Sequence, residues 1–406
     1  MSIIEDIVSR NRLEYQRDNF DAFLKKVGFS YDIPSIHVTG TNGKGSTCNY
    51  LNNIYIASGR KVGLFISPMN YSLCDMIKIN NEDIPESFVE SIFKQYEKFI
   101  NKFVLSAFEI TTFIAFKYFE SEKVDLAIIE CGMGGEVDAT NVFKPVLSVI
   151  TSVSVEHTNA LGVSLSEIAL HKAGIIKEKT PVLIGDIKGD ALDVIVNKAR
   201  YFKSEVHSIR PFNNDKQVDD GYEFGYPPYS NLRINSLAHS SVVDACLAVE
   251  GTNILQSAFP VNEESVKKGL LCNQLIGRFE IHKGNPTIII DGAHNPEAIK
   301  ALRANVDNLH PSVPVHVVFA CFKDKNITIM LPEIALLGEL SLTTFDNPRS
   351  REESDYFLYL EEYKFYNDHI ALIKSLKEQY PDDVILVTGS LAFACLVHKE
   401  LLDGKI

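Results

Sequence analysis

The feature that most constrains this chain is a glycine-rich loop between a short β-branched run and a helix-compatible stretch that begins at Cys48. Glycines allow consecutive backbone N–H groups to converge on an anion, and the start of a helix adds partial positive charge. A lysine in such a loop reaches the outer phosphates of a nucleotide, and a following hydroxyl, here Ser46 or Thr47, contacts a magnesium ion. The stretch therefore predicts a nucleoside triphosphate site, whose loop consists of Gly40, Thr41, Asn42, Gly43, Lys44, Gly45 and Ser46.

The loop matches the Walker pattern imperfectly. Val38 stands five positions before Gly43, where the pattern has its first glycine, and Gly45 separates Lys44 from Ser46. The alternative is an ordinary glycine-rich turn between a strand and a helix. The strand–loop–helix context favours the nucleotide site over that alternative.

Length and composition bound the class of protein. A chain of 406 residues is long enough for two or three domains, and its hydrophobic fraction of 45% is ordinary for a soluble protein. It has neither an apolar run long enough to cross a membrane nor a cationic signal-peptide start, so we expect a cytoplasmic protein without a membrane partner. The net charge of −13 argues against nucleic acid as a partner.

The seven cysteines are dispersed and show no CxxC spacing. This pattern favours reduced thiols over a disulfide framework or a zinc site built from cysteines, and we interpret each cysteine as a buried structural thiol. Cys131 follows Glu130, which is a candidate site residue for the reasons given below, and we interpret Cys131 as a structural thiol as well.

Apolar strands alternate with helical stretches along the whole chain, which predicts an α/β fold with a parallel sheet covered on both faces. Residues 76–84 resemble a small hairpin that turns at Asn80 and Asn81, and residues 138–141 are typical of a turn. Segment 209–235 is loop-rich and less regular, and two helices near 240–255 and 263–272 close the first series. A second series of strands and helices starts near Arg278. We therefore predict a P-loop-containing parallel-sheet ATPase domain over residues 1–274 and a smaller Rossmann-like αβ domain over residues 278–406.

Four polar residues lie at or just beyond predicted strand ends: Ser46, Ser67, Glu130 and His157. In open α/β sheets ligands gather beyond the carboxyl ends of the strands, so these side chains are candidates for one site. Together with a triphosphate they would form a magnesium site, although imidazole is less usual than oxygen for this hard cation. Each residue alone would more simply be a helix cap or a solvated side chain.

Other residues carry weaker signals. Lys172 lies on a predicted helix, where a lysine is ordinarily a surface residue. In the second domain, Arg278 offers a fixed fork for a phosphate, and Asp291 and His294 flank two small residues at a strand end. The glycines at 132–135 resemble a dinucleotide turn only weakly, because a full GxGxxG is absent.

These motifs together resemble the folylpolyglutamate synthase / dihydrofolate synthase family, within the Mur ligase superfamily of ATP-dependent amide-bond-forming enzymes. The resemblance covers nearly the whole chain in order. It is carried by the loop at 40–46 and by the segments 108–111, 130–135, 138–141, 157–158, 161–162, 172–175, 277–279, 291–296, 324–325, 348–349 and 389–391.

The resemblance implies an N-terminal ATPase domain and a C-terminal Rossmann-like domain with ATP between them. It implies that the γ-phosphate of ATP passes to a substrate carboxylate, and that the amine of L-glutamate then displaces phosphate from the acyl phosphate. Lys44 and two Mg²⁺ ions would stabilise the charge on the transferring phosphoryl group. Lys172 would be carbamylated and so provide another anionic oxygen ligand for magnesium.

The resemblance also implies a set of site residues. Lys44, Glu130, His157 and Lys172 would be catalytic, and Ser46, Ser67, Glu130 and His157 would be metal ligands. The nucleotide would contact Gly40, Thr41, Asn42, Gly43, Lys44, Gly45, Ser46, Arg278 and Asp291. His294 and Ser390 would lie near the glutamate or the phosphate.

Several positions depart from the family pattern, mainly on the acceptor side. Met69 and Asn70 replace a usual His-Leu pair, and Asp75-Met76 replaces a usual Glu-Arg pair, which removes a basic residue near the pterin-binding loop. Further departures are Glu136, Glu156, His171 and the segment 241–244.

We predict an ATP- and Mg²⁺-dependent, monomeric ligase that adds L-glutamate to a folate. The alternatives are dihydrofolate synthase activity on dihydropteroate, a ligase with a non-folate acceptor, and a paralogue or switch that only binds nucleotide.

Overall fold

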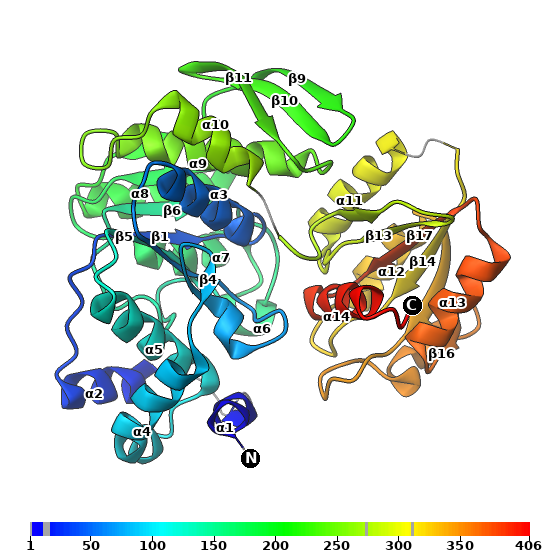
Figure 1. The fold of residues 1–406 in the computed structure, drawn as a ribbon, viewed down its shortest axis with the longest axis horizontal. Coiled ribbons are helices and arrows are strands. Elements are labelled where there is room, and N and C mark those ends of the chain that lie inside the picture. The colour runs from blue at the N-terminus through cyan, green and yellow to red at the C-terminus, as the bar shows by residue number, and fades with distance from the viewer. Residues whose placement is uncertain (1, 11–16, 273–274, 310–311) are drawn as a thin grey trace. The chain divides into compact units, whose positions relative to one another are not determined.

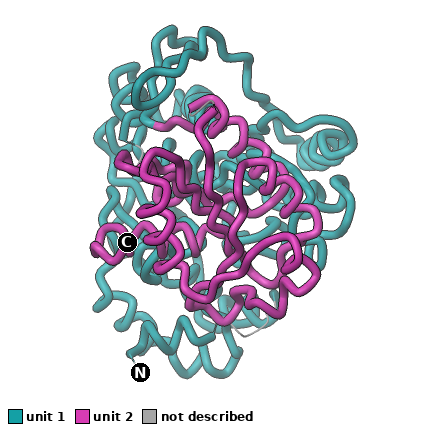
Figure 2. Tube along the Cα trace, turned by 90° about the vertical axis from the view of Figure 1, so that its right-hand side faces the viewer, with its two compact units in different colours: residues 1–235, 241–273 teal, residues 236–240, 274–406 magenta. Residues whose placement is uncertain are grey.

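The computed structural model describes residues 2–10, 17–272, 275–309 and 312–406, which form two compact units (Figures 1 and 2). The first unit comprises residues 1–235 and 241–273, and the second comprises residues 236–240 and 274–406. The domain bounds 1–274 and 278–406 stay a prediction, because a compact unit and a domain are defined differently.

The first unit is built on an eight-stranded sheet of order β4-β3-β2-β5-β1-β6-β7-β8. The strands from β2 to β8 pair in parallel, and β3 and β4 add an antiparallel hairpin at one edge. The hairpin turns at Asn80 and Asn81, as predicted, and both residues have positive φ. The strands are β1 (Ser35–Thr39), β2 (Val62–Phe65), β3 (Ile77–Ile79), β4 (Glu82–Asp83), β5 (Leu126–Glu130), β6 (Leu147–Ile150), β7 (Val182–Ile184) and β8 (Val206–Ser208).

Helices cover both faces of this sheet (Figure 1). Alternate residues of β5 show the division: Leu126 and Ile128 pack with α3, α9 and α10, whereas Ala127 and Ile129 pack with α2, α4 and α5. Every residue of β5 is buried, which explains its unbroken apolar sequence. The helices are α1 (Ile3–Ser9), α2 (Arg17–Val27), α3 (Lys44–Ala57), α4 (Glu86–Lys102), α5 (Ala107–Ser121), α6 (Thr158–Leu161), α7 (Leu165–Lys172), α8 (Gly189–Tyr201), α9 (Ser240–Ile254) and α10 (Glu263–Leu271), with 3-10 turns η2 (Leu73–Met76) and η3 (Ala173–Ile175).

Segment 209–235 is more regular than the sequence predicts. It contains a separate antiparallel sheet of β9 (Asn213–Val218), β10 (Gly221–Tyr226) and β11 (Tyr229–Ile234). Tyr222, Phe224 and Tyr226 alternate along β10 and contact the core beside α3 and α9. Period-two aromatics are typical of a strand, but the surrounding glycines and prolines obscured this signal.

The second unit contains a six-stranded sheet of order β12-β13-β17-β14-β15-β16, parallel except for the antiparallel edge strand β12. This arrangement confirms the predicted smaller αβ series, although β12 and β16 were not predicted. The strands are β12 (Glu280–His282), β13 (Thr287–Ile290), β14 (Val315–Phe319), β15 (Glu339–Thr343), β16 (Lys364–Tyr366) and β17 (Val384–Thr388). The helices are α11 (Pro296–Leu309), α12 (Ile327–Ala335), α13 (His369–Gln379) and α14 (Leu391–Leu402), with the 3-10 turn η4 (Glu353–Tyr359).

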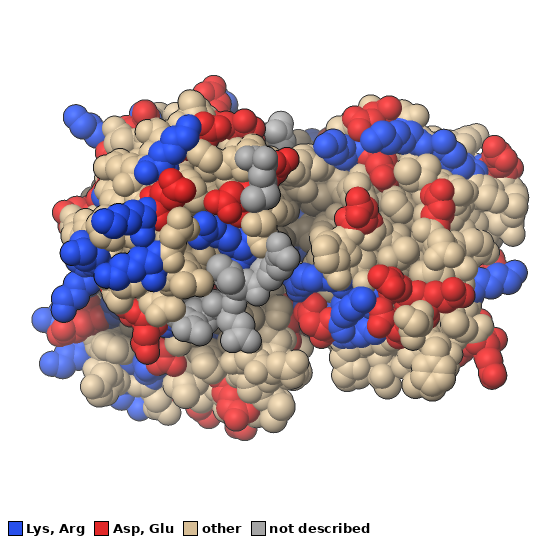
Figure 3. Space-filling view, turned by 90° about the horizontal axis from the view of Figure 1, so that it is seen from below, with Lys and Arg blue, Asp and Glu red and all other residues tan. Residues whose placement is uncertain are grey.

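Acidic and basic side chains are interspersed on the face drawn in Figure 3. Within the described residues, no helix combines the length and the apolar character that a membrane crossing requires.

Candidate active site

The glycine-rich loop joins β1 to α3, as predicted. The helix begins at Lys44, earlier than the predicted start at Cys48, and Gly43 precedes it with a left-handed φ of 83°. The Lys44 ammonium donates to the carbonyl oxygens of Gly40 at 2.9 Å and Thr41 at 3.1 Å. Its charge is therefore held over the loop, where an anionic group bound to the helix start would meet it.

The loop is fixed by the segment that follows β6. Thr41 N–H donates to the Ser152 carbonyl at 3.0 Å, and Asn42 N–H donates to the Ser152 hydroxyl at 2.8 Å. The Thr151 hydroxyl donates to the Asn42 carbonyl at 2.6 Å. These contacts preorganise the loop. Sequence reasoning missed them because they join segments more than a hundred residues apart, with separations of 110 and 109 for the Asn42 pairs.

Gly43 is required by its backbone conformation. Replacing it by alanine is expected to cost about 1–2 kcal/mol, because an L-residue is strained at this φ. A Cβ at this position would also displace the buried Asp244 carboxylate. We expect Gly43→Ala to lower both the free energy of unfolding in urea and the affinity for ATP.

Gly59 provides a matched control for this prediction. It has a similar φ of 86°, but a Cβ there would meet no atom within 4 Å. Gly59→Ala should show the stability loss due to strain and leave ATP affinity unchanged. Equal nucleotide affinities for the two variants would contradict the assignment of Gly43 to the site.

Glu130 connects three elements of the predicted site. It ends β5, is only 2% exposed, and its Oε2 accepts the N–H of Ser67 at 3.2 Å. A Cβ added to Gly45 would lie 3.5 Å from this same oxygen. The carboxylate thus faces the first turn of α3, which also contains Ser46, and it stands near the N-terminal positive charge of that helix.

Lys172 is a buried lysine, contrary to what its helix position alone predicts. It ends α7 with 2% exposure. Burial, and next the charge of Lys44, lower the pKa of Lys172 to about 7, while Glu156 and Cys131 act in the opposite direction. A large fraction of the amine is therefore neutral near neutral pH, the form in which a lysine acts as a nucleophile.

The lowered pKa of Lys172 gives a pH-dependent stability. Its folded pKa of about 7 lies below the ordinary lysine value of 10.5, so between these pH values the unfolded chain binds more protons. Stability therefore rises with pH in this window. From pH 7.5 to 9, in CO₂-free buffer, the wild type should gain up to roughly 2 kcal/mol relative to Lys172→Met, measured by urea unfolding. Parallel pH dependences of the two proteins would show that the buried lysine keeps an ordinary pKa.

His157 is connected to this region through its neighbour. It precedes α6 with a left-handed φ of 51°, and its Nε2 lies 3.2 Å from Oε1 of Glu156. The Glu156 charge in turn acts on Lys172. Glu156, noted in the sequence only as a departure from the family pattern, therefore belongs to the electrostatic surroundings of the site.

The segment after Glu130 forms a rigid turn, as predicted for residues 138–141. The Asp138 carboxylate accepts the N–H groups of Met133 at 2.8 Å and Thr140 at 3.0 Å. Beneath it, His37 Nε2 lies 2.8 Å from the Thr140 hydroxyl and 3.1 Å from Cys131 Sγ. Burial lowers the pKa of His37 to about 3, so this imidazole is neutral, and Cys131 is the buried thiol that we predicted. The same prediction is wrong for Cys272, which is exposed because it follows the end of α10.

This turn also packs against the end of α7. The N–H of Glu136 donates to the His171 carbonyl at 2.8 Å, and a Cβ at Gly135 would lie 3.0 Å from the Lys172 carbonyl oxygen. The glycine at 135 thus permits close packing rather than dinucleotide binding. The turn positions Lys172 relative to the strand that carries Glu130.

In the second unit, Asp291 organises two turns. Its carboxylate accepts the N–H of Phe279 at 2.8 Å and of Ala293 at 2.8 Å. Burial raises the pKa of Asp291, and the charge of the exposed Arg278 opposes that effect. The aspartate therefore fixes the turn that presents the Arg278 guanidinium to solvent.

His294 and Ser390 lie beyond neighbouring strands β13 and β17. His294 Nδ1 is 2.8 Å from the Gly292 carbonyl, and Gly389 N–H donates to the Ala293 carbonyl at 3.1 Å. Ser390 is buried and precedes α14 without a side-chain capping bond. The predicted residues of the second unit thus gather at one end of its sheet.

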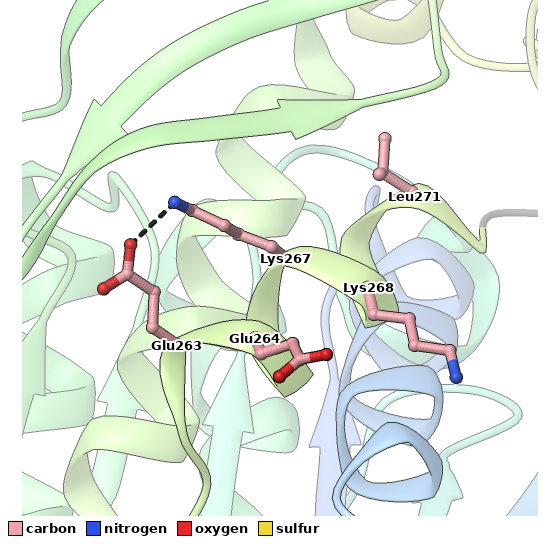
Figure 4. Close-up of a pocket in the computed structure, with 5 residues that line it drawn as sticks. All are labelled: Glu263, Glu264, Lys267, Lys268 and Leu271. Atoms are coloured by element: carbon pink, nitrogen blue, oxygen red, sulfur yellow. Dashed lines mark ion pairs between the residues drawn. The ribbon is translucent and has the colours of Figure 1, made fainter.

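Figure 4 shows a hollow that does not belong to this set of residues. It is lined by side chains of α10, where Lys267 Nζ lies 2.7 Å from Oε1 of Glu263. A hollow on the outer side of one helix brings together no polar groups from different elements. It has no part in the candidate site.

A lysine over a helix-start glycine loop, with a buried carboxylate facing that helix, defines the first unit as a P-loop-type nucleotide-binding fold. Residues 38–219 match the family model "Mur ligase middle domain", and residues 277–391 match "Mur ligase, glutamate ligase domain". The chain is therefore an ATP-dependent ligase of the Mur type.

Similar proteins define the family more closely. Folylpolyglutamate synthase of Lacticaseibacillus casei is 33% identical over 388 residues, which cover 91% of this chain and 90% of that protein. Dihydrofolate synthase/folylpolyglutamate synthase of Bacillus subtilis is 29% identical over 389 residues, covering 91% and 90%. The chain belongs to the folylpolyglutamate synthase / dihydrofolate synthase family.

Solved structures agree with this assignment. A folylpolyglutamate synthase complex with AMPPCP and folate superposes with a TM-score of 0.85 at 29% identity, covering 98% of each chain. Escherichia coli FolC in complex with DHPP and ADP superposes with a TM-score of 0.87 at 25% identity, covering 99% of this chain and 97% of that one. The predicted fold class and family are thereby confirmed.

Proposed function

We propose that this chain uses ATP to add L-glutamate to a folate, releasing ADP and phosphate. The observation that carries the proposal is the convergence of Lys44, Glu130 and Lys172 around the start of α3. The relatives whose structures hold folate, AMPPCP, DHPP and ADP support the choice of substrates.

The reaction follows from the poor reactivity of a carboxylate. An oxygen of the folate carboxylate attacks the γ-phosphorus of ATP, the bond to the β-phosphate oxygen breaks, and ADP leaves. The amine of glutamate then attacks the acyl carbon, phosphate leaves with the bonding electron pair, and the nitrogen loses a proton. Phosphorylation thus converts an oxygen that cannot leave into a good leaving group.

In the first unit, the lysine and the loop would bind the phosphates of ATP, and the polar and acidic residues would bind magnesium. Lys44 would neutralise the transferring phosphoryl group, and the loop residues Gly40 to Ser46 would hold the phosphates. Ser46, Ser67, Glu130 and His157 would hold two Mg²⁺ ions, whose role is Lewis-acid stabilisation of phosphate charge. The buried carboxylate of Glu130, placed against the first turn of α3, fits a cation beside a bound triphosphate.

Lys172 would contribute as a carbamate. Its neutral amine attacks CO₂ and releases a proton, which converts a cation beside Lys44 into an anion. The carbamate removes the repulsion between the Lys44 ammonium and the protonated form of Lys172 and supplies a further oxygen ligand for magnesium.

Residues of the second unit would bind phosphate and glutamate. Arg278 would contact a phosphate, and Asp291 would hold the turn that carries Arg278. His294 and Ser390 would contact the glutamate or the phosphate.

A second candidate is dihydrofolate synthase activity, because the Bacillus subtilis relative carries both names. The segment from Ser67 to Met76, here called the acceptor loop, bears on this choice. Met76 is buried in the core, and Asp75 accepts the N–H groups of Asn70 at 3.0 Å and Tyr71 at 2.6 Å. The departures at Asp75 and Met76 therefore stabilise the loop, which leaves Met69 and Asn70 as the changes that would alter acceptor choice.

The test is glutamate-dependent ADP release by the full chain with tetrahydrofolate, and separately with dihydropteroate. Mass spectrometry should show addition of a glutamyl residue to the accepted substrate. Turnover with dihydropteroate alone would favour the second candidate. Failure of both acceptors to exceed the ATP-only background would refute both. We further propose a monomer, which light scattering during chromatography tests.

A further inference from the structure

A cluster of two imidazoles and a carboxylate lies in the second unit, apart from the residues assigned above. Glu280 and His282 belong to the edge strand β12, and His398 belongs to α14. In the sheet register Glu280 pairs with Ile290 and His282 with Ile288, so each pair shares a face. Ile288 and Ile290 contact the core formed with α14, and the two β12 side chains therefore point toward that helix.

The potential ligand atoms converge on one carboxylate oxygen. Oε1 of Glu280 lies 2.5 Å from Nδ1 of His398 and 2.7 Å from Nε2 of His282. The three ligand atoms all lie within 4.8 Å of one another. The other oxygen, Oε2, accepts the N–H of Gly277 at 3.2 Å, which fixes the carboxylate plane.

Hydrogen bonding explains only part of this arrangement. His282 Nε2 is buried and makes no hydrogen bond within the described residues, although it is close to Glu280 Oε1. A nitrogen lone pair and an anionic oxygen at that distance repel each other, so either a proton on Nε2 or a metal cation must lie between them.

The donor set selects the kind of cation. Two imidazole nitrogens and one carboxylate oxygen are a known zinc ligand set, with a fourth position left for water. Magnesium and calcium prefer sites built from oxygen, so this cluster differs in chemistry from the proposed magnesium site. The side chains of His282, Glu280 and His398 are 30%, 22% and 14% exposed, which gives an ion access from solvent.

We propose that Glu280, His282 and His398 bind one Zn²⁺ ion, which fastens the edge strand β12 to helix α14. Tetrahedral coordination at about 2.0–2.2 Å requires ligand atoms roughly 3.3 Å apart, so small side-chain rotations from the present positions suffice. Because Glu280 also holds Gly277, the ion would stabilise the turn that carries Arg278 as well.

Calorimetric titration of the chelator-treated full chain with Zn²⁺, in buffer containing Mg²⁺, tests the proposal. We expect one tight equivalent, a higher melting temperature with zinc, and tetrahedral d–d absorption when Co²⁺ replaces it. His282→Ala and His398→Ala should each weaken Zn²⁺ binding by at least about 100-fold, more than the loss of an outer contact would. Glu280→Gln should also weaken it.

His207 provides the matched control. Its Nε2 lies 3.6 Å from Oε1 of Glu205, so it is an imidazole beside a carboxylate, with no third ligand among the residues that the structure describes. His207→Ala should keep the tight equivalent and the zinc-dependent rise in melting temperature. Circular dichroism of the metal-free variants checks folding, and His282→Asn and His398→Gln replace any alanine variant that fails to fold. The proposal is overturned if wild-type protein takes up no tight Zn²⁺, or if folded His282 and His398 variants bind it like wild type.

Discussion

Lys44→Ala is expected to lower kcat by on the order of 10³-fold or more and to weaken ATP binding. The Lys44 ammonium is held over the loop by the Gly40 and Thr41 carbonyls, where the outer phosphates of ATP would replace those contacts. Loss of a cation that stabilises the transferring phosphoryl group removes several kcal/mol of transition-state stabilisation. Steady-state ADP release and calorimetric ATP titration measure the two effects.

A solvated lysine of the same unit provides the control. Lys188 pairs with Asp186 at 3.0 Å, and its side chain is 79% exposed. Lys188→Ala should leave kcat and ATP affinity within twofold of wild type, as expected for an exposed ion pair. If Lys44→Ala behaved like Lys188→Ala, the loop would be an ordinary turn and the nucleotide assignment would be wrong.

Lys172→Ala is the second variant with a large expected effect. We expect a fall in kcat of about 10²–10³-fold with a smaller change in KM, because a ligand of the magnesium ions would be lost without loss of substrate contacts. Acetate or another short carboxylic acid, entering the vacated volume, should restore part of the rate. Added bicarbonate should raise the wild-type rate in CO₂-depleted buffer and leave the variant unchanged.

Lys177 is the matched control for Lys172. It lies five positions further along the chain, and burial likewise lowers the pKa of Lys177. Lys177→Ala should change thermal stability more than kcat and should show no rescue by carboxylic acids. Near-wild-type kcat for a folded Lys172→Ala enzyme would rule out the carbamate role.

The effects of Lys44 and Lys172 on activity should also be coupled. The charge of Lys44 contributes to the low pKa of Lys172, so removing Lys44 raises that pKa and reduces the neutral fraction of the amine. The double variant should therefore lose less activity than the product of the single losses. The pH–rate profiles of the single variants report the same coupling.

Local patterns in the sequence predicted the features that local physics determines. Unbroken apolar runs such as β5 require burial on both faces, and the asparagines at 80 and 81 tolerate the left-handed backbone of a hairpin. The loop around Lys44 and the carboxylate of Glu130 at a strand end were predictable for the same reason. Ser67 and His157 were likewise candidates because of their places at predicted strand ends, whereas Lys172 was identified only through the family resemblance. The roles of all three residues stay predictions.

Features that depend on distant contacts were not predictable from one sequence. The contacts of Ser152 with Asn42 and the approach of Asp244 to Gly43 join segments that no periodicity relates. In the sequence, His37 is simply one residue of a β-branched run. In the structure, its imidazole contacts Thr140 and so supports the turn after Glu130. The pairing of Glu280 with His398 spans 118 residues, so only the folded chain brings these two side chains together.

The five residues 236–240 belong to the second unit, although the chain returns to the first unit after them. Ala238 is part of the second unit's core, and His239 N–H donates to Oδ1 of Asn305 at 3.1 Å. During synthesis on the ribosome this segment emerges well before its packing partners exist. These five residues therefore reach their packed state only after the C-terminal half has been made, and a gene cut at the linker would separate them from the core that Ala238 completes.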